Sequence, residues 1–253
     1  MPAQQGRIAL VTGAAQGIGA AIARRLARDG ATVAVNGLTH DERMAAVVAE
    51  TAGSPAVGDI SDPDVVATLI DDIETMHGPI DILVCNAAYM TMAPFGDHDE
   101  NDWWKIIDTN LAAAIHLIQA VLPGMRRSGG GNIVIIASEW GVIGWPEASA
   151  YAASKAGLIA LTKTLGRELA PENITVNAVA PGVTDTPQLQ VDADNAKVSL
   201  AQMHEEYSRG IPIGRIGRPD EIASAVALLA HPELRAFVGQ TIQVNGGSTR
   251  CRA

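Results

Sequence analysis

Short apolar segments with the composition of β-strands alternate with helical patterns along nearly the whole chain. Strands are expected at residues 7–12, 31–36, 55–58, 80–85, 132–138, 174–180 and 240–245, and helices at 18–29, 41–52, from 61 onward, 100–125, 149–170 and 219–230. Strands that are apolar throughout are typical of parallel sheets covered on both faces. No composition break divides the chain. The alternation therefore predicts an α/β fold, a single Rossmann-like, doubly wound domain over residues 1–253 with about seven parallel strands and helices on both faces.

The bulk composition excludes several classes of function. The net charge is −10, from 28 acidic residues against 18 Lys and Arg, whereas nucleic acids and anionic membranes bind basic surfaces. The first residues lack a signal pattern and no apolar run approaches the length of a membrane span, so a cytoplasmic protein is expected. Cys85, Cys251 and the six histidines show no metal-ligand spacing, so no metal site is predicted.

The segment from 183 to 218 interrupts the alternation directly after the sixth expected strand. It is polar and partly acidic, with Asp185, Asp192, Asp194, Glu205 and Glu206. Ligands of such sheets bind at the carboxyl ends of the strands, and long connections are usually functional or disordered. These residues are therefore expected to form a lid over a substrate site. The alternative is a solvated surface excursion.

A possible proton-transfer group lies between residues 138 and 155. Tyr151 and Lys155 are four residues apart, so on a helix they share one face. A lysine charge near the phenol would favour the phenolate and lower a pKa that is ordinarily about 10. Ser138, thirteen residues before the tyrosine, would add a hydroxyl donor. The alternative is an ordinary amphipathic helix with a partly buried Tyr and a solvated Lys.

A glycine-rich turn joins the first expected strand to the first helix. It reads Thr12-Gly-Ala-Ala-Gln-Gly-Ile-Gly19, with glycines at 13, 17 and 19. Glycines at such a turn let the backbone approach a pyrophosphate, which then binds to the free amides of the helix N-terminus. With a strand before it and a helix after it, this turn predicts a dinucleotide site.

Together these motifs give the chain a resemblance to the short-chain dehydrogenase/reductases over nearly its whole length. The glycine spacing matches, as does the constellation of Ser138, Tyr151 and Lys155. Asn86-Ala87-Ala88 resembles the family's Asn-Ala-Gly after the fourth strand, although Ala88 replaces glycine and Cys85 replaces a frequent asparagine. Further similar positions are Asn110 in the long helix, the pair Asp59-Ile60 near adenine, and Pro181-Gly182 with Thr184 and Thr186 near nicotinamide.

The resemblance implies a mechanism and a set of site residues. Tyr151 would exchange a proton with the substrate oxygen while the nicotinamide exchanges a hydride with the carbon, and Lys155 would bind the ribose hydroxyls and lower the tyrosine pKa. Ser138 would hydrogen-bond the substrate oxygen, and Asn110 would hold a water that relays protons to Lys155. Cofactor contacts would come from Gly13, Gln16, Gly17, Ile18, Gly19, Gly37, Leu38, Asp59, Ile60, Asn86, Ala87, Ala88, Tyr151, Lys155, Pro181, Gly182, Thr184 and Thr186.

The choice between NAD and NADP rests on the end of the second strand. Asn36-Gly37-Leu38-Thr39-His40 has neither the acid that binds ribose hydroxyls nor an arginine at position 38 for a 2′-phosphate. His40 and Arg43 are alternative phosphate partners, or they are solvated surface residues. The sequence favours NAD and leaves NADP open.

The resemblance implies a small secondary alcohol or its ketone as substrate. Glu139, Trp140 and Trp145 are candidates for the pocket wall; the alternatives are packing under the lid or on another subunit, and for Glu139 exposure to solvent. A 3-oxoacyl thioester is the commonest family substrate and a polyol or sugar acid comes next, while an acidic surface is a poor match for an acidic carrier protein. The family also implies a homotetramer. The rival functions are a non-catalytic dinucleotide sensor and, last, a sugar-nucleotide epimerase.

Overall fold

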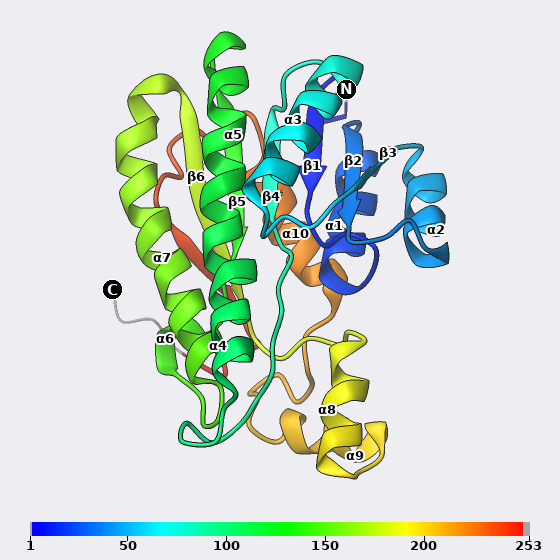
Figure 1. The fold of residues 1–253 in the computed structure, drawn as a ribbon, viewed down its shortest axis with the longest axis vertical. Helices are drawn as coiled ribbons and strands as arrows, with labels where there is room; N and C mark the ends of the chain where they lie inside the picture. Colours follow the sequence, from blue (N-terminus) through cyan, green and yellow to red (C-terminus); the bar gives the residue numbers. More distant parts are fainter. Residues whose placement is uncertain (1, 250–253) are drawn as a thin grey trace.

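The computed structural model describes residues 2–249, so Cys251 lies outside the described part. Within these residues seven strands form one sheet in the order β3-β2-β1-β4-β5-β6-β7 (Figure 1), and all neighbouring pairs are parallel. They are β1 (Ile8–Val11), β2 (Thr32–Gly37), β3 (Ser54–Val57), β4 (Ile82–Cys85), β5 (Gly131–Ile136), β6 (Ile174–Pro181) and β7 (Thr241–Val244). The predicted doubly wound parallel sheet is confirmed.

Helices cover both faces of this sheet. They are α1 (Gly17–Arg28), α2 (Glu42–Thr51), α3 (Pro63–His77), α4 (Glu100–Ile107), α5 (Ala113–Arg127), α6 (Trp140–Ile143), α7 (Ser149–Leu169), α8 (Gln188–Ala196), α9 (Leu200–Ser208) and α10 (Pro219–Leu229). The apolar sides of α3, α5 and α7 share one core cluster with the sheet, whereas α1, α2 and α10 share another. In Figure 1, α3 and α5 lie in front of the strands and α10 lies behind them.

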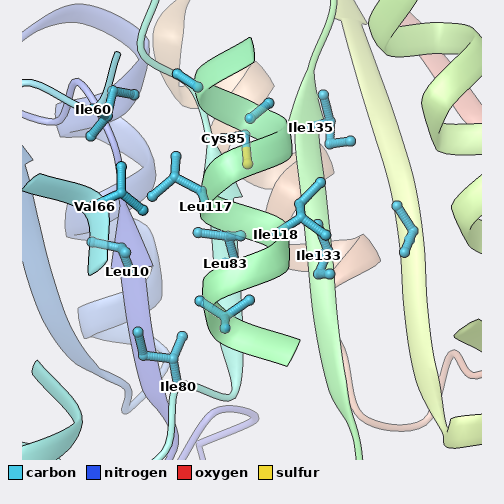
Figure 2. Close-up of a cluster of buried hydrophobic side chains, with 14 of the residues drawn as sticks. Leu10, Ile60, Val66, Ile80, Leu83, Cys85, Leu117, Ile118, Ile133 and Ile135 are labelled. Atoms are coloured by element: carbon cyan, nitrogen blue, oxygen red, sulfur yellow. The ribbon is translucent and has the colours of Figure 1, made fainter. Parts of the chain in front are cut away.

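The helix between β4 and β5 runs from Glu100 to Arg127 and differs from the expectation in two ways. A π-helical turn (Asp108–Ala112) separates α4 from α5. The helix also has the length and hydropathy of a membrane span, with 39% of its most apolar window buried, so the expectation that no segment approached that length is wrong. Its apolar side, including Leu117 and Ile118, packs on the sheet as the core helix of a globular protein does (Figure 2).

Residues 183–218 contain two helices, α8 and α9, that the sequence pattern did not predict. Their apolar side chains form a small cluster of their own, which includes Leu189, Met203 and Ile211. Thr184 and Gly217 form an isolated parallel bridge at the base of the segment. In Figure 1 α8 and α9 lie below the carboxyl ends of the strands. The segment is thus folded on itself and held at the edge of the sheet where ligands of this fold bind.

Candidate active site

A cavity of about 740 Å³ lies at the carboxyl ends of the strands. Its lining extends from the glycine turn after β1 to Ser138, Tyr151 and Lys155, and it includes residues of α8 and α9. The cavity holds most of the residues expected to bind cofactor: Gly13, Gln16, Gly17, Ile18, Gly19, Gly37, Leu38, Asp59, Asn86, Ala87, Ala88, Tyr151, Lys155, Pro181, Gly182, Thr184 and Thr186. One cavity therefore joins the glycine turn to the Tyr-Lys pair.

The glycine turn lies where the strand order reverses, between β1 and β4. Asn86 fixes it, because its side-chain amide donates to the carbonyls of Thr12 and Gly13 (2.8 and 3.2 Å). A Cβ at Gly19 would lie 2.3 Å from the Gly13 carbonyl oxygen, and one at Gly13 would lie 2.8 Å from Ala87 Cα. Only glycine fits at these close approaches. The N-terminus of α1 opens into the cavity behind them, which is the geometry that binds a pyrophosphate.

The far end of the cavity is formed by the last residues of β2 and the residues that follow it. Buried Asn36 accepts from the Gly13 amide and donates to the carbonyls of Ala56 and Gly58. Arg43 also lines the cavity, where its guanidinium donates to Gln16 Oε1 (2.7 Å) and pairs with Asp41. His40, the other alternative from the sequence, is outside the lining.

Ile60 does not line the cavity, contrary to the expectation from the resemblance. Its side chain is 5% exposed and belongs to the core cluster on the face of the sheet that α3, α5 and α7 cover, where Figure 2 labels it near Val66. Its neighbour Asp59 faces the cavity, as expected.

Tyr151 and Lys155 lie one turn apart on α7, as predicted. The Lys155 ammonium is buried, donates to the Ile136 carbonyl (2.8 Å) and lies 5.4 Å from the centre of the Tyr151 ring. Burial lowers the pKa of Lys155 to about 8. The Tyr151 hydroxyl is hydrogen-bonded with Ser138, which favours phenolate, but burial has the larger effect and raises the tyrosine pKa to about 12.

The expected lowering of the tyrosine pKa is therefore absent from the protein on its own. Desolvation of the phenolate exceeds the effect of the hydrogen bond with Ser138, and burial also lowers the pKa of Lys155, the nearby cation. A positive charge placed in the cavity would act in the opposite direction.

Asn110 is buried in the π-helical turn and does not line the cavity. Its amide donates to the Tyr89 carbonyl (3.0 Å) and to Ser154 Oγ (3.2 Å), and its carbonyl accepts from the Tyr89 amide (2.7 Å). Both ends of the side chain are thus committed to protein groups. The water relay through Asn110 stays a prediction.

The candidate substrate residues are placed differently from one another. Trp140 is buried and lines the cavity, with its ring edge toward Tyr151 (5.9 Å between centroids). Trp145 stacks on Trp140 from outside (5.0 Å) and is 42% exposed, so it supports the wall without lining it. Glu139 lines the cavity but is buried and hydrogen-bonded to Ser248, so the solvent-exposed alternative is wrong.

Sequence reasoning missed the other cavity-lining residues. They are Ala15, Asn36, Thr39, Asp41, Gly58, Tyr89, Met90, Lys105, Thr109, Ile136, Ala137, Val183, Pro187, Gln188, Leu189, Asp192 and Tyr207. On α8, Gln188 donates to Asp192 (3.0 Å), whose pKa is raised by burial. For the members of this list that lie in residues 183–218, the sequence signals were the acidic pattern and, before α9, the Ser199-x-x-Gln202 capping box. Among residues 2–249 no group of three His, Cys, Asp or Glu is placed to hold a metal ion.

Comparisons with known proteins identify the family of the chain. A family model described as enoyl-(acyl carrier protein) reductase matches residues 13–249. The chain is a short-chain dehydrogenase/reductase. Its relatives include the 3-oxoacyl-[acyl-carrier-protein] reductase of Thermotoga maritima, 37% identical over 96% of this chain and 98% of the relative, and nodulation protein G of Azospirillum brasilense, 39% identical over 95% and 97%.

A solved structure extends the comparison to three dimensions. Ligand-free aldohexose dehydrogenase of Thermoplasma acidophilum matches this short-chain dehydrogenase/reductase with a TM-score of 0.91 at 33% identity, covering 98% of this chain and 95% of that one. Fold, motifs and relatives agree on the reaction class. The protein is an NAD(P)-dependent oxidoreductase that interconverts alcohols and ketones.

Proposed function

We propose that this oxidoreductase acts on a small polyhydroxy compound, a sugar or a polyol, within one catalytic domain whose lid is residues 183–218. The observation that carries this proposal is the lid wall of the cavity. Gln188, Asp192 and Tyr207 line it together, and their amide, carboxylate and phenol groups donate to and accept from hydroxyls. A few such polar groups in a largely apolar pocket are what orient a small ligand.

The residues present fit a bound dinucleotide. The glycine turn leaves no room for a Cβ at Gly13 or Gly19, and the cavity continues from there to Tyr151. When bound, the nicotinamide would exchange a hydride with the substrate carbon. Lys155 would hold the ribose hydroxyls, and its ammonium is already fixed on the Ile136 carbonyl.

The chain itself would handle the proton. Ser138 would donate to the substrate oxygen while Tyr151 gives or takes the proton at its phenol, and their existing hydrogen bond sets the two hydroxyls at the same point of the cavity. The raised tyrosine pKa favours the protonated phenol, which is the form needed to reduce a ketone. Buried and prepositioned groups of this kind act through orientation and fixed electrostatics.

Relatives favour a second candidate, reduction of a 3-oxoacyl thioester. Several relatives at 37–39% identity are named as 3-oxoacyl-[acyl-carrier-protein] reductases. The net charge of −10 opposes docking of an acidic carrier protein. A panel of aldohexoses and polyols with oxidised cofactor, against acetoacetyl-CoA with reduced cofactor, followed by cofactor absorbance, separates the candidates. Turnover of the thioester alone would reject the polyhydroxy proposal, and cofactor binding without any turnover would favour the sensor.

Asp192 provides the sharper test. Asp192→Leu should raise KM for a polyhydroxy substrate by about tenfold or more, since a lost hydrogen bond to a charged group costs roughly 1.5–3 kcal/mol. The matched control is Asp194→Leu, because Asp194 forms the same contact with Gln190 (2.8 Å) on the same helix and does not line the cavity. An equal effect of the two substitutions would contradict recognition by Asp192.

Arg43 leads us to favour NADP(H) over the NAD favoured by the sequence. Its guanidinium is held at the adenosine end of the cavity by Gln16 and Asp41, and residues 36–40 at the end of β2 include no acid. A 2′-phosphate there would replace Asp41 as the partner of the guanidinium. We further propose a homotetramer in the cytoplasm, which light scattering of the purified protein and fractionation of the source cells would test.

A further inference from the structure

Glu139 follows Ser138 directly, yet the reaction described above assigns no task to its carboxylate. The side chain is 5% exposed. None of the ion pairs found among the described residues includes it. A buried carboxylate without a cation is costly unless several donors satisfy it.

Those donors come from the ends of two other strands. The Ser248 hydroxyl, after β7, donates to Glu139 Oε2. The Asn245 side chain and the main-chain amide of Val183 also hydrogen-bond to the carboxylate. In addition, the Glu139 amide donates to the Pro181 carbonyl at the end of β6 (3.0 Å). One residue at the end of β5 thus joins the ends of β6 and β7.

The junction is tightly packed. A Cβ at Gly182 would lie 2.8 Å from Asn245 Cβ and 3.2 Å from Glu139 Oε1. The strand ends lie this close because residue 182 has no side chain. The hydrogen bonds to the carboxylate also prevent them from separating.

This junction borders the reacting groups on two sides. Ser138 directly precedes Glu139, and its hydroxyl is hydrogen-bonded with the Tyr151 phenol. Pro181, Gly182 and Val183 line the same cavity as that phenol. We propose that Glu139 is a positioning residue, whose buried carboxylate holds Ser138 and the Pro181–Val183 wall in register for hydride transfer and ties the segment after β7 to the active site.

This inference rests on the oxidoreductase reaction and not on the polyhydroxy substrate. Any ketone or alcohol that the wild type turns over serves for its kinetic test. The affinity for NADPH, measured by quenching of tryptophan fluorescence, tests whether the Pro181–Val183 wall is correctly placed, and this measurement needs no substrate. The failure of the substrate proposal is therefore distinguishable from a failure here.

The first experiment compares Glu139→Gln with Glu139→Leu. Glutamine keeps an oxygen acceptor for Ser248 and for the Val183 amide, so kcat should stay within about threefold of wild type. Leucine leaves the Ser248 hydroxyl and the Val183 amide without this acceptor, whereas the Asn245 amide still donates to Gln243 and Thr249. We expect kcat to fall at least about tenfold, because reacting groups displaced by a fraction of an ångström lose much of their orientation. NADPH affinity should weaken in the leucine variant as well. Glu147→Leu is the matched control, since Glu147 is exposed, belongs to the same segment and is outside the cavity lining.

A second variant, Ser248→Ala, allows the proposal to be tested even if Glu139→Leu folds poorly. Ser248→Ala removes one donor only and should lower kcat about two- to fivefold in the wild-type background, but should have no further effect beside Glu139→Leu if the two residues act as one unit. A purely structural role would lower the unfolding midpoint and leave kcat per folded enzyme unchanged. That result, or loss of kcat in Glu139→Gln equal to that in Glu139→Leu, would overturn the proposal.

Discussion

Burial of the charged Lys155 side chain should lower the free energy of unfolding of the protein. Its pKa is lowered from 10.5 to about 8 in the folded chain, so between pH 8 and 10.5 the unfolded chain binds more protons and stability rises with pH. Taking 1.36 kcal/mol per pKa unit, the charged lysine costs about 3 kcal/mol at pH 7 and about 1 kcal/mol at pH 9.5.

Lys155→Met removes the charge and keeps a side chain of similar length. At pH 7 the variant should be more stable by about 1–2 kcal/mol, because the unpaired Ile136 carbonyl offsets part of the relief by about 1–2 kcal/mol. The clearer signature is the pH dependence: between pH 7 and 9.5 the wild type should gain about 2 kcal/mol relative to the variant. Tyr151 and Cys85, whose pKa values burial raises to about 12, stay neutral over this range in both proteins.

Urea unfolding at fixed protein concentration and several pH values measures this difference. Turnover of the variant should be lost while its unfolding free energy increases, so that stability and activity change in opposite directions. Parallel pH profiles for wild type and Lys155→Met would refute the argument, since they would mean that Lys155 titrates in the folded protein as it does in the unfolded chain. Lys163→Met is the matched control, because Lys163 is an exposed lysine on the same helix and does not line the cavity.

Two further predictions concern the reaction and the cofactor. Tyr151→Phe should reduce kcat by at least about a hundredfold while NADPH affinity changes little, because the ring and its edge contact with Trp140 remain; normal turnover would exclude the phenol as the proton donor. Arg43→Ala should lower kcat/KM for NADPH by about tenfold or more with little change for NADH. Arg24→Ala is its control, because Arg24 is an exposed arginine that pairs with Glu50 outside the cavity; equal losses with both cofactors would show that Arg43 does not recognise the phosphate.

The sequence predicted those parts of the fold that depend on local periodicity. Apolar strands alternating with helices specify a parallel sheet, and each strand was placed within one or two residues of its observed bounds. The π-helical turn at 108–112 was missed because nothing in the periodicity of an apolar helix marks one extra residue in a turn. Helices α8 and α9 were missed because they bury few residues, all of them in one small shared cluster.

In the site too, features set by sequence spacing could be predicted, whereas features set by tertiary packing could not. The spacing of Tyr151 and Lys155 is local, so their shared face could be predicted. The direction of the tyrosine pKa was wrong because desolvation depends on what covers the phenol, which spacing does not reveal. Ile60 was misplaced for a related reason: the strand end that exposes Asp59 turns the next side chain into the core.

Each buried polar group of the site is satisfied by hydrogen bonds within the protein. The partners of these groups differ from those of the residues expected to select cofactor and substrate. Lys155 is held by the Ile136 carbonyl, Asn110 by the main chain of Tyr89, and Glu139 by donors at the ends of β6 and β7. Lys155 and Asn110 are anchored to backbone groups, which are present wherever this sheet forms, so motifs alone can predict the reaction, whereas two of the three donors to Glu139 are side chains. Arg43 and Asp192 instead lie on partly exposed rims and bind neighbouring side chains, which can change without disturbing the sheet. The choice of cofactor and substrate should therefore depend on these two rims.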